Sequence, residues 1–181
     1  MMVDAEAQLI ARYDLTNLPH AIMLWDARWS PSLVGLVAGK LLERFARPIV
    51  VIGCHEGNWI GSGRSIAAYN ITEGMRAAGE GMLTRAGGHV EACGFALSSA
   101  DHLGELAEHL AAHAKTALGD RPLVPTLECE ADISLEAVDM SLTEAVEALA
   151  PFGEGKRRPM FISRNIRIVA IDLIGSTKNH L

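Results

Sequence analysis

The chain has 181 residues, of which 49% are hydrophobic and 21% charged, a composition typical of a globular protein with one or two small domains. Its net charge of −6 argues against a protein that coats nucleic acid by bulk electrostatics. No apolar run approaches the ~20 residues of a membrane-spanning helix, the N-terminus lacks the order of a secretory signal, and the odd number of cysteines argues against a disulfide framework. We therefore expect a cytoplasmic protein with no membrane partner.

The first two thirds of the chain predict alternating helices and strands. In chain order we expect a helix at 4–13, a strand at 20–27, a helix at 31–46, strands at 47–53 and 59–65, a helix at 70–80, a strand at 93–98 and a helix at 103–118. Ser30 and Pro31 have the residue types of an N-cap and a first helical position. Asn70 and Glu73 have the spacing of a capping box, and Gly119 should end the last helix. This alternation favours an α/β or α+β fold, a mixed sheet flanked by helices.

A different kind of segment comes after the predicted linker DRPLVP at 120–125. It predicts a strand around 127–133, a helix over 141–149 and a strand with alternating Ile166, Ile168 and Ala170. Ser141 and Glu144 have capping-box spacing at the start of this helix. One or two strands without further partners cannot close a sheet. We therefore expect this end of the chain to pack on the body, to self-associate through its unfinished sheet, or to fray.

Two glycine-containing stretches, GSGRS at 61–65 and RAGGH at 85–89, are expected to be loops that bind phosphate. Backbone N–H groups in glycine turns hold phosphate oxygens well, and glycine lets a ligand approach the backbone closely. The Arg64 guanidinium and the Ser65 hydroxyl would supply further donors, and the His89 ring could donate to a phosphate or to a leaving-group oxygen. The alternative is that both stretches are tight turns, and either stretch taken alone favours that alternative.

The chain has no residue pattern that predicts a metal or catalytic centre. Asp101 and His102 stand at the start of an amphipathic helix, where a solvated cap is a better interpretation than a metal ligand. Zinc sites usually show paired close spacings. The nearest candidate set lacks such spacing and consists of Cys54, His55, His89 and Cys93. We therefore predict no metal, cofactor or catalytic residue in this chain.

Basic and aromatic residues offer two further nucleic-acid contacts. GKRRP at 155–159 is the densest basic cluster, and it fits a polyanion contact and a solvated loop equally well. Trp29 precedes a predicted helix and is the tryptophan that we expect at the surface, where it could stack on a base. Trp25 and Trp59 lie in or beside predicted strands and are expected in the core.

Four motifs in this order resemble the C-terminal half of RecJ-like single-strand-specific exonucleases of the DHH phosphoesterase superfamily. They are WSPSLVGLVAGKLLERFARPIVVI, GSGRS, RAGGHVEACGF and LAPFGEGKRRPMF. The resemblance runs from about Leu24 to Ile174. It departs from the family at Ser30 and Ser32, where a His and a Gly are usual, and at Lys156, where Asn is usual. The domains that it implies are 1–19 as the tail of a linker helix, 20–120 as a DHHA1 domain, and 121–181 as an incomplete oligonucleotide-binding (OB) segment.

The resemblance implies that the DHHA1 domain clamps a single strand of DNA, or of RNA, over a DHH catalytic domain that this chain lacks. That catalytic domain, in cis or in trans, would hold two Mn²⁺ or Mg²⁺ ions and degrade the strand from 5′ to 3′. The implied phosphate-binding residues are Gly63, Arg64, Ser65, Gly87, Gly88 and His89, with Arg85, Lys156, Arg157 and Arg158 as further nucleic-acid contacts. Alone, the chain is expected to bind nucleic acid weakly and to hydrolyse nothing.

Two other functions stay open at this point. One is a related phosphoesterase for short oligonucleotides or cyclic dinucleotides, although the PFGEGKRRP stretch is typical of the exonuclease branch. The other is a non-catalytic binding subunit in replication or repair, which the lack of an Asp/His cluster suits. The coding sequence upstream of the chain would distinguish these functions.

Overall fold

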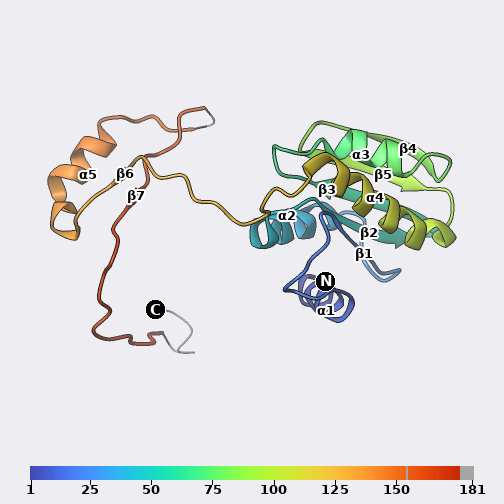
Figure 1. Cartoon of the computed structure of the whole chain (residues 1–181), viewed down its shortest axis with the longest axis horizontal. Helices are drawn as coiled ribbons and strands as arrows, with labels where there is room; N and C mark the ends of the chain where they lie inside the picture. The colour runs from blue at the N-terminus through green and yellow to red at the C-terminus, as the bar shows by residue number, and fades with distance from the viewer. Residues whose placement is uncertain (154, 176–181) are drawn as a thin grey trace. The chain divides into compact units, whose positions relative to one another are not determined.

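A computed structural model describes residues 1–153 and 155–175 of the chain (Figure 1). The chain forms two compact units, Met1–Pro125 and Thr126–Leu181. The first unit contains the main sheet and the helices that flank it. The second contains a short strand pairing and one further α-helix within its described residues.

The first unit is built on a mixed sheet of five strands in the order β1-β2-β3-β5-β4. The strands are β1 (Ile22–Trp25), β2 (Ile49–His55), β3 (Asn58–Arg64), β4 (Leu83–Gly88) and β5 (Ala92–Leu97). β1 and β2 are parallel, whereas all the other neighbours are antiparallel. β2 and β3 form a tight hairpin, and its turn residues Glu56 and Gly57 have φ angles of 50° and 79°, as in a type I′ turn.

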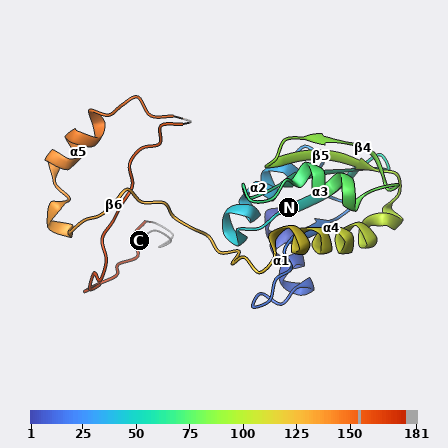
Figure 2. The ribbon, with the colours of Figure 1, turned by 45° about the horizontal axis from the view of Figure 1, so that its top comes forward.

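Helices cover both faces of this sheet, but to different extents. They are α1 (Met2–Arg12), α2 (Val34–Phe45), α3 (Ile71–Ala78) and α4 (Leu103–Leu118). α3 and α4 pack against each other and lie along the sheet in both ribbon views (Figures 1 and 2). Because strand side chains alternate between the two faces, the buried residues form two clusters. One cluster lies under α3 and α4, and the other lies under α1 and α2.

The two faces differ most over strands β3, β5 and β4. On the face that α3 and α4 cover, which we call the closed face, Cys93, Phe95 and Leu97 of β5 are all buried. On the other face, α1 packs over β1, and α2 packs over β2 and β3, so that β5 and β4 are left without a covering helix. The remaining surface, which we call the open face, consists of Ile60, Ser62, Arg64, Arg85, Gly87, Ala92, Gly94 and Ala96, all exposed or half-buried.

The mixed sheet and its flanking helices confirm the predicted fold class. The helix predicted at 70–80 is α3, and the Asn70 side chain accepts the predicted hydrogen bond from the Glu73 N–H at 3.2 Å. Gly119 ends α4 with a φ of 59°, again as predicted. Periodicity and capping residues were sufficient here because each signal is local.

The predicted helix start at Ser30 and Pro31 is wrong, because α2 begins at Val34. The carbonyl of Trp29 accepts a hydrogen bond from the Cys54 N–H at 3.1 Å, which ties this segment to β2. The Ser30 hydroxyl bonds to the hydroxyl of Ser32 at 2.8 Å and does not cap the helix. A contact between segments distant in sequence therefore delays the helix by one turn.

The second unit has little regular structure. Its elements are β6 (Ala131–Asp132), α5 (Met140–Glu147) and β7 (Phe161–Ile162), and β6 pairs with β7 in parallel. The helix is found where it was predicted, but Asp139 caps it instead of Ser141, because Asp139 accepts from the Leu142 N–H at 2.9 Å.

The two strands predicted in this unit are largely wrong. The one at 127–133 is reduced to two residues, and within the described part of the chain 166–170 forms no strand. Ile168 and Val169 are 71% and 81% exposed, because no strand or helix among the described residues of this unit packs on them. Self-association through this segment stays a prediction.

The Arg47 side chain joins the segment before β1 to the segment after α4. Its guanidinium donates to the carbonyls of Leu18 and Pro19, just before β1, at 2.9 and 2.8 Å. It also donates to the carbonyl of Leu123, after α4, at 3.2 Å. The segments that lead into β1 and away from α4 are therefore held together by one side chain.

Candidate nucleic-acid interface

The two glycine stretches lie mostly within strands: the strand predicted at 59–65 is confirmed as β3, whereas the loops predicted at 61–65 and 85–89 are not found. Gly61 to Arg64 belong to β3, and Arg85 to Gly88 belong to β4. A Cβ atom on Gly61 would lie 2.2 Å from the Phe95 ring, and one on Gly63 would lie 2.7 Å from the Cys93 sulfur. The glycines of β3 are needed because the closed face is tightly packed, and not because the chain turns there.

The two stretches lie on either side of β5. Ser62 opposes Gly94, which opposes Gly87, and Gly63, Cys93 and Gly88 form the next row. Arg64 opposes Ala92, whose carbonyl accepts a hydrogen bond of 2.7 Å from the His89 N–H. Arg64 and His89 are therefore level with each other, two strand spacings apart, which is roughly 10 Å between their backbones.

The open face between them has a floor without side chains. Gly87 and Gly94 are exposed, and a Cβ atom added to either would have no neighbour within 4 Å. At the edge of this floor, a Cβ on Gly35 of α2 would lie 3.0 Å from Nη2 of Arg64. A ligand can therefore approach the backbone of β4 and β5 closely while one wall of the site carries an arginine.

Arg64 is held in place by its own strand. Its Nη1 donates to the Ser62 hydroxyl and to the Gly63 carbonyl, both at 2.8 Å. Among the described residues, no hydrogen bond uses its Nε or Nη2, and no carboxylate forms an ion pair with it. The edge formed by Nε and Nη2 matches the two-donor geometry that binds a phosphate.

His89 is exposed at the turn that joins β4 to β5. Its carbonyl accepts a hydrogen bond of 2.6 Å from the Thr72 hydroxyl, which fixes the backbone beside the start of α3. Gly88 has a φ of 151°, and a Cβ there would lie 2.2 Å from the Ala92 carbonyl oxygen. Glycine is therefore required just before His89 for a reason of backbone geometry.

Three of the predicted phosphate ligands do not point to the open face, and one of them is Gly88, which shares a row with Gly63 and Cys93. Ser65 is 3% exposed, and its hydroxyl donates to the Tyr69 carbonyl at 2.8 Å. Gly63 is buried between β2 and β5. Ser62 takes the place that the sequence assigned to Ser65, because a strand side chain two residues before Arg64 shares its face. The alternation within GSGR was the signal that could have found it.

The remaining predicted contacts fall into both units. Arg85 is exposed on the open face, where it opposes Ala96. In the second unit, Arg158 forms an ion pair with Glu147 at 2.6 Å, and Arg157 lies 3.8 Å from Glu128. Lys156 is exposed and its backbone bridges to Gly153. The basic cluster of this unit is thus partly neutralised by its own carboxylates.

Trp29 is not a surface residue, so the predicted stacking contact is wrong. It is 3% exposed and belongs to the cluster beneath α1 and α2. Its indole N–H has no hydrogen-bond partner among the described residues. Trp25 and Trp59 are half-buried against the other cluster, and the Arg12 guanidinium lies 3.7 Å from the centre of the Trp25 ring.

The described residues contain no group of three His, Cys, Asp or Glu side chains placed to hold a metal ion. Asp101 lies in a one-turn 3-10 helix that Ser99 caps, and the Ser99 hydroxyl accepts from the Asp101 N–H at 3.2 Å. Cys93 is 4% exposed, and this burial raises the pKa of its thiol to about 11. A group with so high a pKa is protonated at neutral pH and is a poor ligand or nucleophile.

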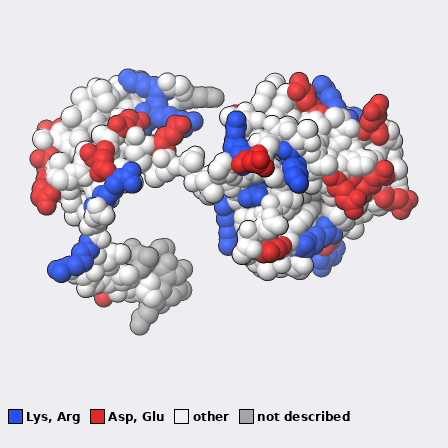
Figure 3. Space-filling model, viewed as in Figure 1, with Lys and Arg blue, Asp and Glu red and all other residues white. Residues whose placement is uncertain are grey.

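Surface charge alone does not mark a nucleic-acid site. In Figure 3, Asp and Glu side chains gather at one end of the first unit, on the right of the view, and Lys and Arg are more frequent toward the other end. Because the net charge is −6, a polyanion must be held by specific contacts and not by a general positive field. The open face offers such contacts.

Comparison with known proteins decides the family. The profile of the DHHA1 domain matches residues 17–116, more than half of the chain. The chain belongs to the DHHA1 family. A second profile, that of the RecJ OB domain, matches residues 129–181, beyond the DHHA1 region. The resemblance to RecJ-like proteins is thereby confirmed.

The DHHA1 and OB regions of this chain are similar to those of RecJ proteins. The chain is 30% identical over 182 residues to the single-stranded-DNA-specific exonuclease RecJ of Bacillus subtilis, covering 99% of this chain and 23% of that protein. RecJ of Thermus thermophilus is 31% identical over 144 residues, covering 78% of this chain and 20% of that protein. The chain therefore spans about a quarter or less of the length of these two relatives.

Solved structures support the same assignment. The crystal structure of Thermus thermophilus RecJ in complex with Mn²⁺ matches with a TM-score of 0.73 at 26% identity, over 90% of this chain and 23% of that one. The Mg²⁺ complex of the same protein gives 0.71 at 27% identity, over 88% of this chain and 24% of that one. In the described part of this DHHA1 protein, no helix is both long and apolar enough to cross a membrane.

Proposed function

We propose that the open face binds the phosphates of a single DNA strand and presents the strand to the catalytic DHH domain of a cytoplasmic, RecJ-like 5′-to-3′ exonuclease. In this proposal residues 20–120 hold the strand, and 121–181 contribute part of an OB domain. The observation that carries it is the placement of Arg64 and His89 on either side of β5, level with each other and next to a glycine floor.

The contacts that we assign are those that the geometry of the open face allows. The free edge of Arg64 binds one phosphate as a fork, and Ser62 holds that arginine in position. His89 donates a ring N–H to the same phosphate or to the next one. Gly87 allows the DNA to approach β4 closely, whereas Gly63, Ser65 and Gly88 support the sheet from its packed side.

Metal chemistry belongs to the DHH domain in this proposal. The RecJ structures that resemble this chain are complexes with Mn²⁺ or Mg²⁺. The residues assigned above are an arginine, a histidine, a serine and glycines, which suit phosphate oxygens better than a divalent cation. The DHHA1 region would therefore position the substrate, and the metals would activate the attacking water.

The test is the affinity of the 181-residue chain for a short, fluorescently labelled DNA strand. Arg64→Ala removes a charge-assisted contact worth about 1.5–3 kcal/mol, so binding should weaken roughly tenfold to hundredfold. His89→Ala should weaken binding less, because it removes a single ring N–H donor, whereas Arg64→Ala removes a charged two-donor edge. An RNA strand of the same sequence, measured in parallel, shows whether the site distinguishes the two sugars.

Arg76→Ala is the matched control. It removes an exposed arginine from α3, which covers the closed face, and should change the affinity by less than about twofold. If Arg64→Ala binds as tightly as the unmodified chain, or if Arg76→Ala weakens binding equally, the open face is not the phosphate site.

A further inference from the structure

The register of β4 against β5 shifts by one residue at Thr84. Leu83 opposes Leu97, but Arg85 opposes Ala96, so β4 contains one residue more than its partner over this stretch. The Thr84 hydroxyl donates to the Ala96 carbonyl at 3.3 Å. This is a β-bulge, a feature that often turns a side chain toward a functional surface.

The bulge moves Arg85 to the open face. In a regular strand, Leu83 and Arg85 would point to the same face, because side chains repeat every two residues. Here Leu83 packs against the core under α3 and α4, whereas Arg85 lines a cavity together with Ile60 and Ala96. Arg85 therefore shares a face with Arg64, and no ion pair among the described residues involves it.

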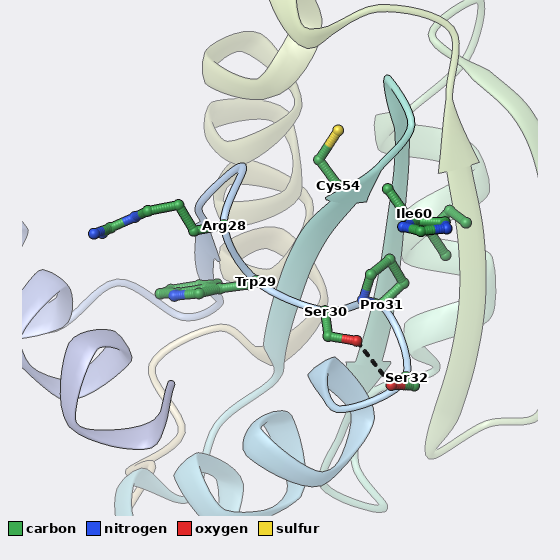
Figure 4. Close-up of a pocket in the computed structure, with 8 residues that line it drawn as sticks. Arg28, Trp29, Ser30, Pro31, Ser32, Cys54 and Ile60 are labelled. Carbon is green, nitrogen blue, oxygen red and sulfur yellow. Dashed lines mark hydrogen bonds between the residues drawn. The ribbon is translucent and has the colours of Figure 1, made fainter.

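The cavity beside Arg85 has a volume of about 370 Å³. Its other lining residues are His55, Asn58 and Thr84, which are polar and exposed. A neighbouring cavity of about 520 Å³ shares His55 and Ile60 with it and extends to the two hydroxyls of Ser30 and Ser32 (Figure 4). Together they form a hollow at the hairpin end of β3 that is lined by both apolar and polar residues.

This hollow lies at the opposite end of β3 from the site at Arg64. Ile60 and Arg64 are separated by four residues of the strand, which corresponds to about 13 Å along it. The glycine floor of Gly87 and Gly94 lies between the two ends. In a stacked strand the rise is ~3.4 Å per nucleotide, so a single nucleotide does not bridge this distance.

We propose that Arg85, with His55 and Asn58, forms a second phosphate subsite that binds the same DNA strand several nucleotides away from Arg64. This inference rests on the proposed function of the open face, and it adds the path and the minimum length of the bound strand. The DNA runs from Arg64 on β3 across the glycine floor on β5 and β4 to Arg85 on β4, with an arginine at each end. The Glu56 carboxylate lies 3.9 Å from the His55 ring, so Arg85 supplies most of the attraction to phosphate at this end.

The experiment compares a dinucleotide with a hexanucleotide, both 5′-phosphorylated, on the unmodified chain and its variants. The dinucleotide can occupy one subsite, whereas the hexanucleotide can reach both. Arg85→Ala should weaken hexanucleotide binding about tenfold and leave dinucleotide binding within about twofold. Arg64→Ala should weaken binding of both probes. Arg85→Lys, which keeps the charge, should restore part of the loss.

Salt dependence gives a second, independent readout. For single strands the slope of log affinity against log salt is about −0.7 for each phosphate neutralised. Arg85→Ala should therefore reduce the slope for the hexanucleotide by about 0.7 and leave the slope for the dinucleotide unchanged.

The outcomes separate the two proposals. If Arg64→Ala weakens the binding of both probes and Arg85→Ala weakens the binding of neither, the proposal of a second subsite is wrong and the proposed function stands. If Arg85→Ala weakens both probes equally, Arg85 belongs to the first site and the inference about strand length is wrong. If Arg64→Ala weakens neither probe, the phosphate site itself is wrong, and the second subsite with it.

Discussion

The two faces of strands β3, β5 and β4 use glycine for opposite reasons. On the closed face, Gly61 and Gly63 leave room for Phe95 and Cys93, and any Cβ would collide with them. On the open face, Gly87 and Gly94 leave a space that no protein atom fills within 4 Å. The first pair serves packing, whereas the second pair leaves the backbone accessible to a ligand. Glycine-rich sequence therefore indicates a binding site only when the face of each glycine is known.

The largest expected effect is the protection of Cys93, which the closed face shields from solvent. Burial raises the pKa of its thiol to about 11, so at neutral pH the thiolate is roughly a hundredfold scarcer than for an ordinary cysteine. Alkylation of Cys93 by iodoacetamide at about pH 7.5, followed by mass spectrometry, should be at least ~100-fold slower in the native chain than in urea. The rate should increase as the pH rises toward the pKa. Fast labelling of the native chain would show that the closed face opens.

A methyl group distinguishes the two glycine pairs. Gly61→Ala forces a Cβ to within 2.2 Å of the Phe95 ring, and such overpacking should lower the free energy of unfolding by about 1–3 kcal/mol. Gly94→Ala adds the same methyl group to open space and should change the free energy of unfolding by less than about 0.5 kcal/mol. Urea denaturation of the two variants provides the comparison. Equal losses would mean that the two faces are packed alike.

The smallest effect is expected from filling the floor of the open face. Gly94→Val should leave the unfolding midpoint almost unchanged, because β-branched residues suit strands and nothing stands in the way. It should weaken binding of a hexanucleotide about threefold to tenfold, which corresponds to the loss of roughly 1 kcal/mol of close contact. A Gly94→Val chain that binds as tightly as the unmodified one would show that the strand does not pass over this floor.

Elements defined by local signals could be predicted from the sequence. Asn70, Glu73 and Gly119 mark the ends of α3 and α4 through contacts with residues one turn away. Apolar runs correctly placed β1 and β2, since a buried strand needs apolar side chains on both faces. The prediction of a strand at 166–170 was wrong, because alternating apolar residues indicate a strand only where another strand can pair with it.

The parts of the interface that depend on register could not be predicted. Nothing in RAGGH shows that Thr84 bulges, and without the bulge Arg85 would point to the closed face. Likewise, the Ser65 hydroxyl is of a type that binds phosphate, but it donates to the Tyr69 carbonyl instead. That hydrogen bond depends on how the chain turns after β3. The sequence motifs identified the correct strands, whereas the pairing of those strands decides which side chains share a surface.

The hydrogen bonds of Arg47 bear on how such a domain moves between proteins in evolution. Leu18 lies just before β1 and Leu123 lies after α4, and one guanidinium binds the backbone at both points. A module whose two ends meet can be spliced into a longer polypeptide as a cassette, because the host chain is interrupted at a single place. The polypeptide beyond Leu123 can therefore be exchanged, lengthened or lost over generations without rebuilding the sheet.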